Sequence, residues 1–339
     1  MTTFLKACRG ESTDFTPIWL NRQAGRYMPE YRQLKGNRTS LEFFTDPEAA
    51  ARVTLEAQRQ LRVDAAIVFA DLLPILQPMG LDLSYAPGVG PVFSNPIRNP
   101  DDVTNLQVVP PKEGTGYIAD TIRFVLSDLP SEISLIGFAG APFTLAAYAI
   151  EGKGSQQYTI AKSFMYEHPQ SWFELLEKLT NSIVGYVNLQ IEAGIDAVQI
   201  FDSWVGCLSR YEYDSYVAPA TQKVFSSIAD SVPKIYFATG NQHLLQSMYA
   251  TGPDFMALDW RVPLVQTWKE LGCPAIQGNM DPIAVCATPE VVKEHASRLL
   301  EDVNGRPGHI FNLGHGIVPQ TPVDNVKLLV DFVHEQSSR

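Results

Sequence analysis

Eight short apolar runs alternate with longer helical patterns, and no other feature constrains the fold of this chain as strongly. The runs lie near Thr16, Ala65, Ser134, Asp196, Pro233, Asp254, Pro274 and His309. Most of them are almost continuously apolar, as is typical of parallel strands buried on both faces. Because helical patterns separate the runs, we predict an α/β protein with a parallel sheet, and the count of eight predicts a single (β/α)8 barrel of the TIM type.

The helical patterns begin with recognisable signals. Asp46 and Thr288 stand directly before Pro47 and Pro289, so each places a capping side chain ahead of a first-turn proline. A third helix is predicted over residues 168–194, and its closing glycine suits a C-terminal cap.

The chain has 339 residues, a length that one large barrel can take up. No tandem repeat, low-complexity block or linker of serine and glycine interrupts the alternation. The proline-rich region over residues 87–111 is interpreted as an excursion from the barrel and not as a domain boundary. We therefore expect one domain over residues 1–339.

Composition restricts the partners and the compartment. The net charge of −11 argues against nucleic acid, because phosphate binding depends on a surplus of Lys and Arg over one face. The four cysteines form no C-x-x-C pair and are interpreted as reduced thiols. The N-terminus lacks the apolar core of a secretory signal, and the longest uncharged run, residues 133–150, contains glycines and a proline that indicate a strand, a turn and a helix start. We expect a cytoplasmic protein with no membrane partner.

Polar residues follow every apolar run. Because the carboxyl ends of the strands in such a barrel meet at one mouth, we expect these groups to gather there. In chain order they are Asn21 and Arg22, Asp71, Tyr148 after the stretch GAPFT, Asp202 and Ser203, Thr239 and Gly240, Asp259 and Trp260, Asn279 and Asp281, and finally Gly314, His315 and Gly316.

The segment IWLNRQAGRYMPEYR, residues 18–32, is rich in arginine although the chain is acidic. Arg22 and Arg26 are four residues apart, so on a helical turn they would share a face and could clamp carboxylates. The alternative is a structural ion pair with an acid such as Glu30 or Glu42. Spacing alone leaves both interpretations open.

Asp71 and His315 are the acid and the histidine best suited to a site. Asp71 emerges directly from an apolar run, where an acid can be a helix N-cap, a site carboxylate or both. His315 lies between two glycines after the last run, an arrangement that lets the backbone turn and present the imidazole. The other five histidines look like helix, loop or cap residues.

Motifs of several other site classes are absent. No H-E-x-x-H occurs, and His315 has no neighbouring cysteine to complete a zinc site, so we expect no metal. The run EGKGS at residues 151–155 lacks the spacing of a phosphate-binding P-loop. The sequence also lacks G-x-G-x-x-G at the start of a strand–helix unit and G-x-S-x-G, which argues against dinucleotide redox enzymes and hydrolases.

Two longer stretches are more specific. RQAGRYMPEYR from Arg22 and GFAGAPFTLAAYAIEG from Gly137 resemble the signature stretches of the uroporphyrinogen decarboxylase family, whose enzymes act in haem and tetrapyrrole biosynthesis. FADLLPILQPMG, QIFDSWVG, ALDW, QGNMDP and NLGHGI are similar to the same family, in its order, over essentially the whole chain. Two positions depart from it, since the family commonly has methionine in place of Asn21 and often lysine in place of Thr239. The second departure bears on how a peripheral carboxylate is held.

The resemblance implies a cofactor-free, metal-free homodimer that acts on uroporphyrinogen III. Its four acetate arms would lose CO2 and become the methyl groups of coproporphyrinogen III. The substrate-binding residues implied by the resemblance are Arg22, Arg26, Asp71, Tyr148, Ser203 and His315, and the catalytic ones are Asp71, Arg22 and Tyr148. A pyrrole protonated on carbon would accept the electrons, with Asp71 stabilising its positive charge. The proton donor stays open between Arg22, Tyr148, His315 and a held water.

Two alternatives share the barrel. A cobamide-dependent methyltransferase would need a zinc site of His and Cys ligands, and the stretch GHGIVP after the last run contains no cysteine. A non-catalytic tetrapyrrole carrier would have no reason to keep an acid under the ring, whereas Asp71 is present. Turnover of uroporphyrinogen distinguishes the decarboxylase from the methyltransferase and from the tetrapyrrole carrier.

Overall fold

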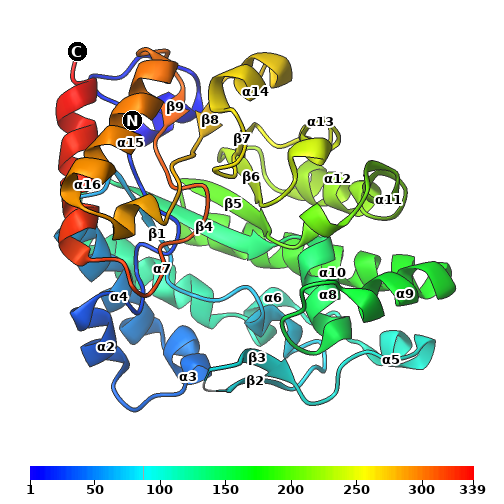
Figure 1. Ribbon diagram of the computed structural model, residues 1–339. Helices are drawn as coiled ribbons and strands as arrows, with labels where there is room; N and C mark the ends of the chain where they lie inside the picture. Colours follow the sequence, from blue (N-terminus) through cyan, green and yellow to red (C-terminus); the bar gives the residue numbers. More distant parts are fainter. Residues whose placement is uncertain (87) are drawn as a thin grey trace.

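The computed structural model describes residues 1–86 and 88–339, and within them seven parallel strands form one curled sheet (Figure 1). The strands, in their order across the sheet, are β1 (Ala65–Ile67), β4 (Ser134–Gly140), β5 (Ala197–Asp202), β6 (Lys234–Ala238), β7 (Phe255–Ala257), β8 (Ile276–Gln277) and β9 (His309–Ile310). Each pairs in parallel with the next, so their carboxyl ends lie at one end of the sheet.

The segment around Ile18 lies between β9 and β1 and closes the ring. Ile18 forms a parallel bridge with Phe311, whose N–H donates to the Pro17 carbonyl at 2.8 Å, and the Asp64 N–H donates to the Ile18 carbonyl at 2.9 Å. The prediction of a regular strand near Thr16 is wrong. Pro17 has no N–H, and the Ile18 amide donates to the Asp64 carboxylate at 2.7 Å and not to a neighbouring strand. The TIM-type barrel is nevertheless confirmed.

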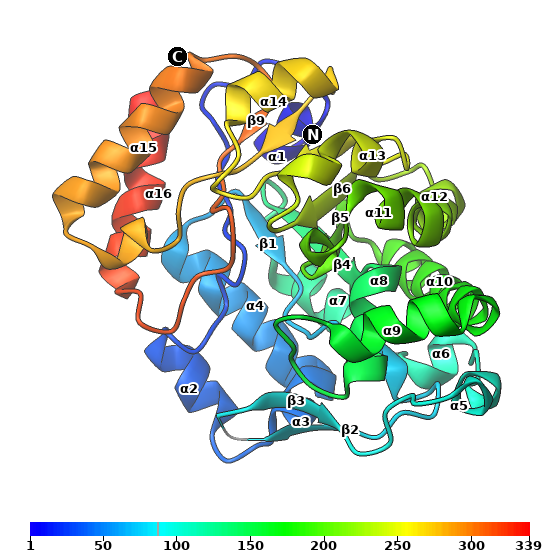
Figure 2. The same cartoon turned by 45° about the vertical axis from the view of Figure 1, so that its right-hand side comes forward.

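Helices surround the sheet on its outside (Figures 1 and 2). They are α1 (Thr3–Cys8), α2 (Pro29–Lys35), α3 (Ser40–Thr45), α4 (Pro47–Leu61), α5 (Pro100–Asn105), α6 (Pro111–Gly114), α7 (Tyr117–Asp128), α8 (Pro142–Glu151), α9 (Thr159–Glu167), α10 (Pro169–Ala193), α11 (Arg210–Tyr216), α12 (Ala218–Ser227), α13 (Leu245–Tyr249), α14 (Leu264–Leu271), α15 (Pro289–Val303) and α16 (Val323–Ser337). Short 3-10 helices are η1 (Pro74–Leu76), η2 (Val205–Cys207), η3 (Gln242–Leu244) and η4 (Ala284–Cys286). In the part of the chain that is described, no helix combines the length and the apolarity needed to cross a bilayer.

The predicted helix starts are confirmed. The Asp46 carboxylate accepts from the Ala49 N–H at 3.1 Å at the start of α4. Helix α15 begins directly after Thr288, although that side chain makes no capping hydrogen bond. Helix α10 ends at Gly194, whose φ of 111° lies in the left-handed region that favours glycine.

An antiparallel hairpin of β2 (Leu83–Ala86) and β3 (Gly90–Phe93) spans the start of the predicted proline-rich excursion, because β2 precedes residue 87 and β3 lies within residues 87–111 (Figure 2). Pro87, its first predicted residue, lies outside the described residues. Val92 bridges to Lys153, and the Phe93 N–H donates to the Gly152 carbonyl at 2.8 Å, which ties the hairpin to the end of α8. The excursion thus folds back onto the barrel and brings Tyr85 towards the residues that follow β1.

Candidate active site

The sequence-predicted site residues all lie at the carboxyl ends of the strands. Arg22 and Arg26 sit in the turns after the segment around Ile18, and Asp71 follows β1. Tyr148 is on α8, which follows β4, and Ser203 comes directly after β5. His315 follows β9. Parallel strand order therefore brings residues that are far apart in the sequence to one mouth.

Asp71 is half-buried and makes one local hydrogen bond. Its Oδ1 accepts from the Leu73 N–H at 3.0 Å, a turn contact two residues ahead. The short helix η1 begins after Leu73 without any side-chain cap, so Asp71 is not the N-cap of a helix. The Tyr85 hydroxyl also acts on this carboxylate as a hydrogen-bond donor and lowers the pKa of Asp71.

Burial dominates the electrostatics of Asp71. It raises the pKa of this carboxyl above its ordinary value, while the Leu73 amide, the Tyr85 hydroxyl and the Arg22 charge act in the opposite direction. The charge of Arg22 also acts against the rise in the pKa of Tyr148 and adds to the lowering of the pKa of His315. The same guanidinium thus acts on Asp71, Tyr148 and His315.

Arg22 and Arg26 are exposed, and their guanidinium groups form no ion pair or hydrogen bond with the described residues. The alternative of a structural ion pair with Glu30 or Glu42 is therefore not realised. The condition for the two side chains to share a helical face is not met, since Arg22 has a φ of 62° and the first helix after it is α2. Two unpaired guanidinium groups at the mouth of an acidic protein are suited to carboxylates.

Arg26 belongs to the same charged region as Arg22. Burial raises the pKa of the neighbouring Tyr31. The charge of Arg26 acts against this rise, and the charge of Asp71 adds to it. Both an arginine and the site acid thus act on one tyrosine ring, so the basic turns and Asp71 face a common space.

Tyr148 faces the aromatic residue that follows Ser203. The Tyr148 and Trp204 rings are 5.7 Å apart between centroids. Burial, with the Asp71 charge, raises the pKa of Tyr148 to about 12. The Ser203 carbonyl accepts from the Thr239 hydroxyl at 3.0 Å. Thr239 therefore braces the end of β5.

His315 is half-buried and is held by its own loop. Its Nδ1 accepts from the Gly316 N–H at 2.6 Å, so Nδ1 carries no proton and Nε2 carries it in the neutral ring. Burial and the Arg22 charge lower the pKa of His315, which keeps the imidazole neutral at pH 7.

The two glycines around His315 are required by close packing and not by a left-handed backbone. A Cβ on Gly314 would overlap the backbone of Trp260, and a Cβ on Gly316 would overlap the Arg22 side chain. Neither glycine has a positive φ. Gly316 thus provides the surface over which Arg22 extends toward the mouth.

Sequence reasoning missed two tyrosines next to the acid. The Tyr85 hydroxyl on β2 is buried, and burial, the charge of Asp71 and hydrogen bonding to Asp71 raise its pKa. Tyr117, at the start of α7, has a pKa raised by burial and by the charge of Asp71. No pattern marks either residue, because the hairpin and α7 are brought to Asp71 only by the tertiary fold.

Asp259 and Arg261 have a structural role at the ends of β6 and β7. The buried Asp259 accepts from the Gly240 N–H at 2.8 Å and from Nε of Arg261 at 2.8 Å. The Arg261 guanidinium lies 4.2 Å from the centre of the Trp260 ring. These groups line a hollow of about 400 Å³ together with residues 240–243.

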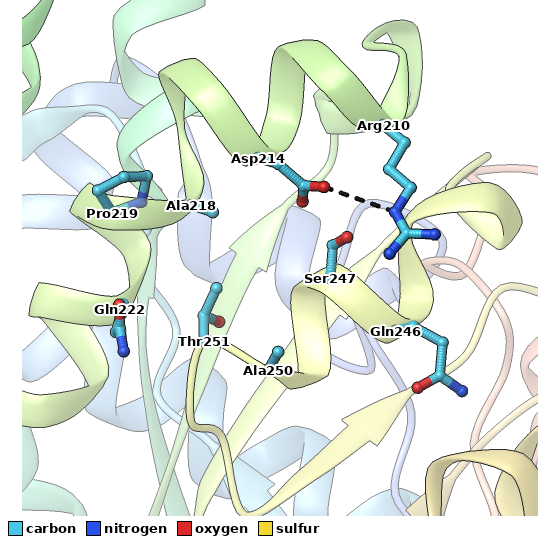
Figure 3. Close-up of a pocket in the computed structure, with 9 residues that line it drawn as sticks. All are labelled: Arg210, Asp214, Ala218, Pro219, Gln222, Gln246, Ser247, Ala250 and Thr251. Carbon is cyan, nitrogen blue, oxygen red and sulfur yellow. Dashed lines mark ion pairs between the residues drawn. The ribbon is translucent and has the colours of Figure 1, made fainter.

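A second depression lies outside the mouth. It is formed by residues of α11, α12 and α13, including Asp214, Gln222 and Ser247, and the ion pair of Arg210 with Asp214 crosses one side of it (Figure 3). It contains none of the sequence-predicted site residues.

Metal ligands are not gathered anywhere in residues 1–86 and 88–339: no group of three or more His, Cys, Asp or Glu side chains is placed to hold an ion. All four cysteines, Cys8, Cys207, Cys273 and Cys286, are free. The residues that do gather at the mouth are two unpaired arginines, an acid with a raised pKa, a neutral histidine and several tyrosines. This set can bind a polyanion and stabilise a positive charge that forms next to Asp71.

Known proteins similar to this chain share its whole length. A uroporphyrinogen decarboxylase from Roseiflexus sp. is 48% identical over 99% of this chain and 98% of its own length. A uroporphyrinogen decarboxylase from Carboxydothermus hydrogenoformans is 47% identical over 99% of this chain and 97% of its own length. One from Geotalea uraniireducens is 43% identical over 100% of this chain and 99% of its own length.

Among solved structures, a methyltransferase from Methanosarcina mazei superposes with a TM-score of 0.83 at 21% identity, covering 98% of each chain. A B12-independent methionine synthase from Shewanella sp. superposes with a TM-score of 0.56 at 11% identity, covering 87% of this chain and 89% of that one. At these identities the likeness concerns the fold alone. The uroporphyrinogen decarboxylase (URO-D) family model, in contrast, matches residues 1–336, and this chain belongs to that family.

Proposed function

We propose that this protein is a carboxy-lyase that removes CO2 from the four acetate arms of uroporphyrinogen III and yields coproporphyrinogen III. Relatives that carry the name uroporphyrinogen decarboxylase match nearly the full chain at 43% to 48% identity. The observation in the structure that carries the proposal is the half-buried Asp71, whose pKa burial raises, in the field of the unpaired Arg22.

The arginines bind the substrate in this proposal. Arg22 and Arg26 are exposed, have no protein partner among the described residues and lie at the mouth, so they can each take a carboxylate arm through two parallel N–H bonds. Ser203, Tyr148 and His315 supply further polar contacts to the arms. A net charge of −11 makes such local cations necessary for a polyanionic substrate.

Asp71 acts on the reacting ring. A proton is first added to a ring carbon of the pyrrole. The bond between the acetate CH2 and its carboxylate then breaks, CO2 leaves, and the electron pair forms an exocyclic double bond that neutralises the ring. The exocyclic CH2 takes up a proton and becomes the methyl group while the ring carbon releases its proton, so each arm consumes one proton overall. The protonated ring is cationic, and the Asp71 carboxylate stabilises this cation and accepts pyrrole N–H bonds. The stabilisation is larger in the transition state than in the neutral substrate, which is the requirement for catalysis.

Two candidate proton donors are weak acids at neutral pH. Tyr148 has a pKa raised to about 12 by burial and by Asp71. His315 has a lowered pKa and is neutral, with its remaining proton on Nε2. We therefore assign Tyr148 and His315 to positioning the acetate arm that reacts, together with Arg22.

Several further expectations belong to the same proposal. The family resemblance supports a homodimer in the cytoplasm that needs no metal or organic cofactor. The match of the family model to residues 1–336 supports one domain over residues 1–339.

Turnover is the test. The purified full chain is incubated with uroporphyrinogen III under anaerobic conditions, and the oxidised porphyrins are separated by chromatography. We expect coproporphyrin to accumulate through intermediates with seven, six and five carboxylates. Binding without any product would favour a tetrapyrrole carrier, and methyl transfer from a cobamide with zinc in the protein would favour the methyltransferase.

A further inference from the structure

Helix α8, which carries Tyr148, begins without a capping side chain of its own. Its N-cap residue is Ala141, which makes no side-chain capping hydrogen bond. The Ala141 N–H donates to the Phe201 carbonyl of β5 at 2.8 Å, so the start of the helix lies against the end of that strand. The first N–H groups of a helix need partners from outside the helix, and β5 is the element placed to supply one.

Asp202, the last residue of β5, brings a carboxylate to this end of α8. The side chain is fully buried, and both of its oxygens accept: Oδ1 from the Thr144 hydroxyl at 2.7 Å and Oδ2 from the Tyr236 hydroxyl at 2.7 Å. Burial raises the pKa of Asp202 to about 6, and the two hydroxyls and the Thr144 N–H act against this rise. At pH 7 a negative charge thus lies at the N-terminal end of α8, where the helix dipole favours it.

The Thr144 hydroxyl connects Asp202 with Trp204. Besides donating to the carboxylate, it accepts from the Trp204 N–H at 3.3 Å. A backbone N–H can only donate, so the hydroxyl must turn its own proton to Asp202, and both hydrogen bonds have a fixed direction. Thr144 is fully buried. Valine has the same shape as threonine, but it could make neither bond.

Trp204 is held by α8 at two points. Thr144 and Tyr148 are four residues apart and therefore lie on the same face of the helix. Thr144 binds the backbone of Trp204, and the Tyr148 ring lies against the Trp204 ring, with centroids 5.7 Å apart. The Tyr158 ring lies against the same indole at 5.6 Å. The place of Tyr148 relative to the end of β5 is therefore set by the contacts that Trp204 makes.

We propose that Thr144 and Asp202 are positioning residues for the decarboxylation: they fix Trp204 and the start of α8, and through these they place the Tyr148 hydroxyl at the reacting acetate arm. The inference rests on the proposed function, in which Tyr148 positions that arm. Both residues are fully buried, so they act through Tyr148 and not on the substrate.

The variant Thr144→Val keeps the shape of the side chain and removes its hydroxyl. We expect kcat/KM for uroporphyrinogen III to fall by about tenfold to a hundredfold, because a small misplacement of a substrate-orienting group has effects of this size. Thr144→Ser retains the hydroxyl and should bring kcat/KM back to within about threefold of wild type. No rescue by serine would overturn the proposal.

Thr251→Val is the matched control. It removes another buried threonine hydroxyl, which donates to the Met248 carbonyl at 2.6 Å and lies at the depression outside the mouth. Both valine variants should unfold at lower urea concentrations than wild type, whereas only Thr144→Val should lose kcat/KM. Equal losses of kcat/KM in the two variants would mean that any buried hydroxyl has this effect, and the proposal would be wrong.

A double-mutant cycle shows whether Thr144 acts through Tyr148. In the Tyr148→Phe background the hydroxyl to be positioned is already gone, so adding Thr144→Val should change kcat/KM by less than about threefold. Losses that multiply in the double variant would show that Thr144 supports the fold independently of Tyr148, which contradicts the proposal.

Crystal structures of the wild type and of Thr144→Val give a readout that does not depend on turnover. We expect the Tyr148 ring to leave its place against Trp204 in the variant, and unchanged rings would overturn the proposal. A wild type that does not convert uroporphyrinogen would refute the proposed function, and these structures would still decide what places Tyr148. If Thr144→Val does not fold, Thr144→Ala takes its place with the same outcomes, because its smaller side chain leaves room for a water to pair with the freed groups.

Discussion

The substitution Asp71→Asn separates the charge of this side chain from its shape. Asparagine retains an oxygen that can accept from the Leu73 N–H, as Asp71 does at 3.0 Å, so the local turn is preserved. Only the negative charge under the reacting ring is removed. The expected effects on catalysis and on stability have opposite signs, which makes the variant informative.

The expected fall in kcat follows from the position of the Asp71 carboxylate under the reacting ring. Two unit charges about 4 Å apart interact by about 4 kcal/mol at the effective dielectric of roughly 20 that suits a partly buried site. Each 1.36 kcal/mol in the barrier is about tenfold in rate. We therefore expect kcat to fall by about three orders of magnitude. Burial raises the pKa of Asp71, so the charged form is disfavoured in the folded protein, and asparagine should leave the free energy of unfolding at pH 7 equal or higher.

The assay measures coproporphyrinogen formation under anaerobic conditions and, in parallel, urea unfolding. Asp281→Asn is a matched control, because Asp281 follows another strand and its Oδ1 accepts from the Ile283 N–H at 2.8 Å in the same kind of turn. The control should keep near-normal turnover. If Asp71→Asn lost less than about threefold in kcat, or lost activity only together with stability, the role given to this charge would be refuted.

Three further substitutions test other parts of the account. Arg22→Lys removes the bidentate contact, worth about 1.5–3 kcal/mol, and should raise KM by about tenfold to a hundredfold in steady-state kinetics. Gly316→Ala places a Cβ against the Arg22 side chain and should lower kcat/KM, whereas Gly154→Ala, with open space around it, should not. Burial raises the pKa of Asp202 from 3.8 to about 6, so the folded protein holds this proton more tightly than the unfolded chain does. The free energy of unfolding therefore contains the whole Asp202 contribution below about pH 4, and it falls by about 3 kcal/mol as the pH rises to 6. The difference in urea unfolding between wild type and Asp202→Asn should show this slope, and a flat difference would contradict it.

The barrel could be predicted from the sequence because buried parallel strands leave a strong signal. Each of the seven strands of the observed sheet falls on one of the eight apolar runs. The remaining run, near Thr16, forms no regular strand and closes the ring through Ile18. Whether a backbone amide pairs with a strand or with a distant carboxylate such as Asp64 depends on tertiary placement, and no local pattern contains that information.

The candidate site was predictable only in part, for a similar reason. Asp71, Ser203 and His315 follow strands closely, and the barrel geometry alone indicates that they share a mouth. Tyr85 and Tyr117 reach Asp71 from the β2–β3 hairpin and from α7, elements whose position is set by packing.

The most direct test of the central claim is a crystal structure of the protein with coproporphyrinogen III bound, prepared and frozen without oxygen. The account predicts that the pyrrole N–H groups face the Asp71 carboxylate at hydrogen-bonding distance, with carboxylate arms on Arg22 and Arg26. A macrocycle bound with its nitrogens away from Asp71, or bound outside the mouth, would contradict it.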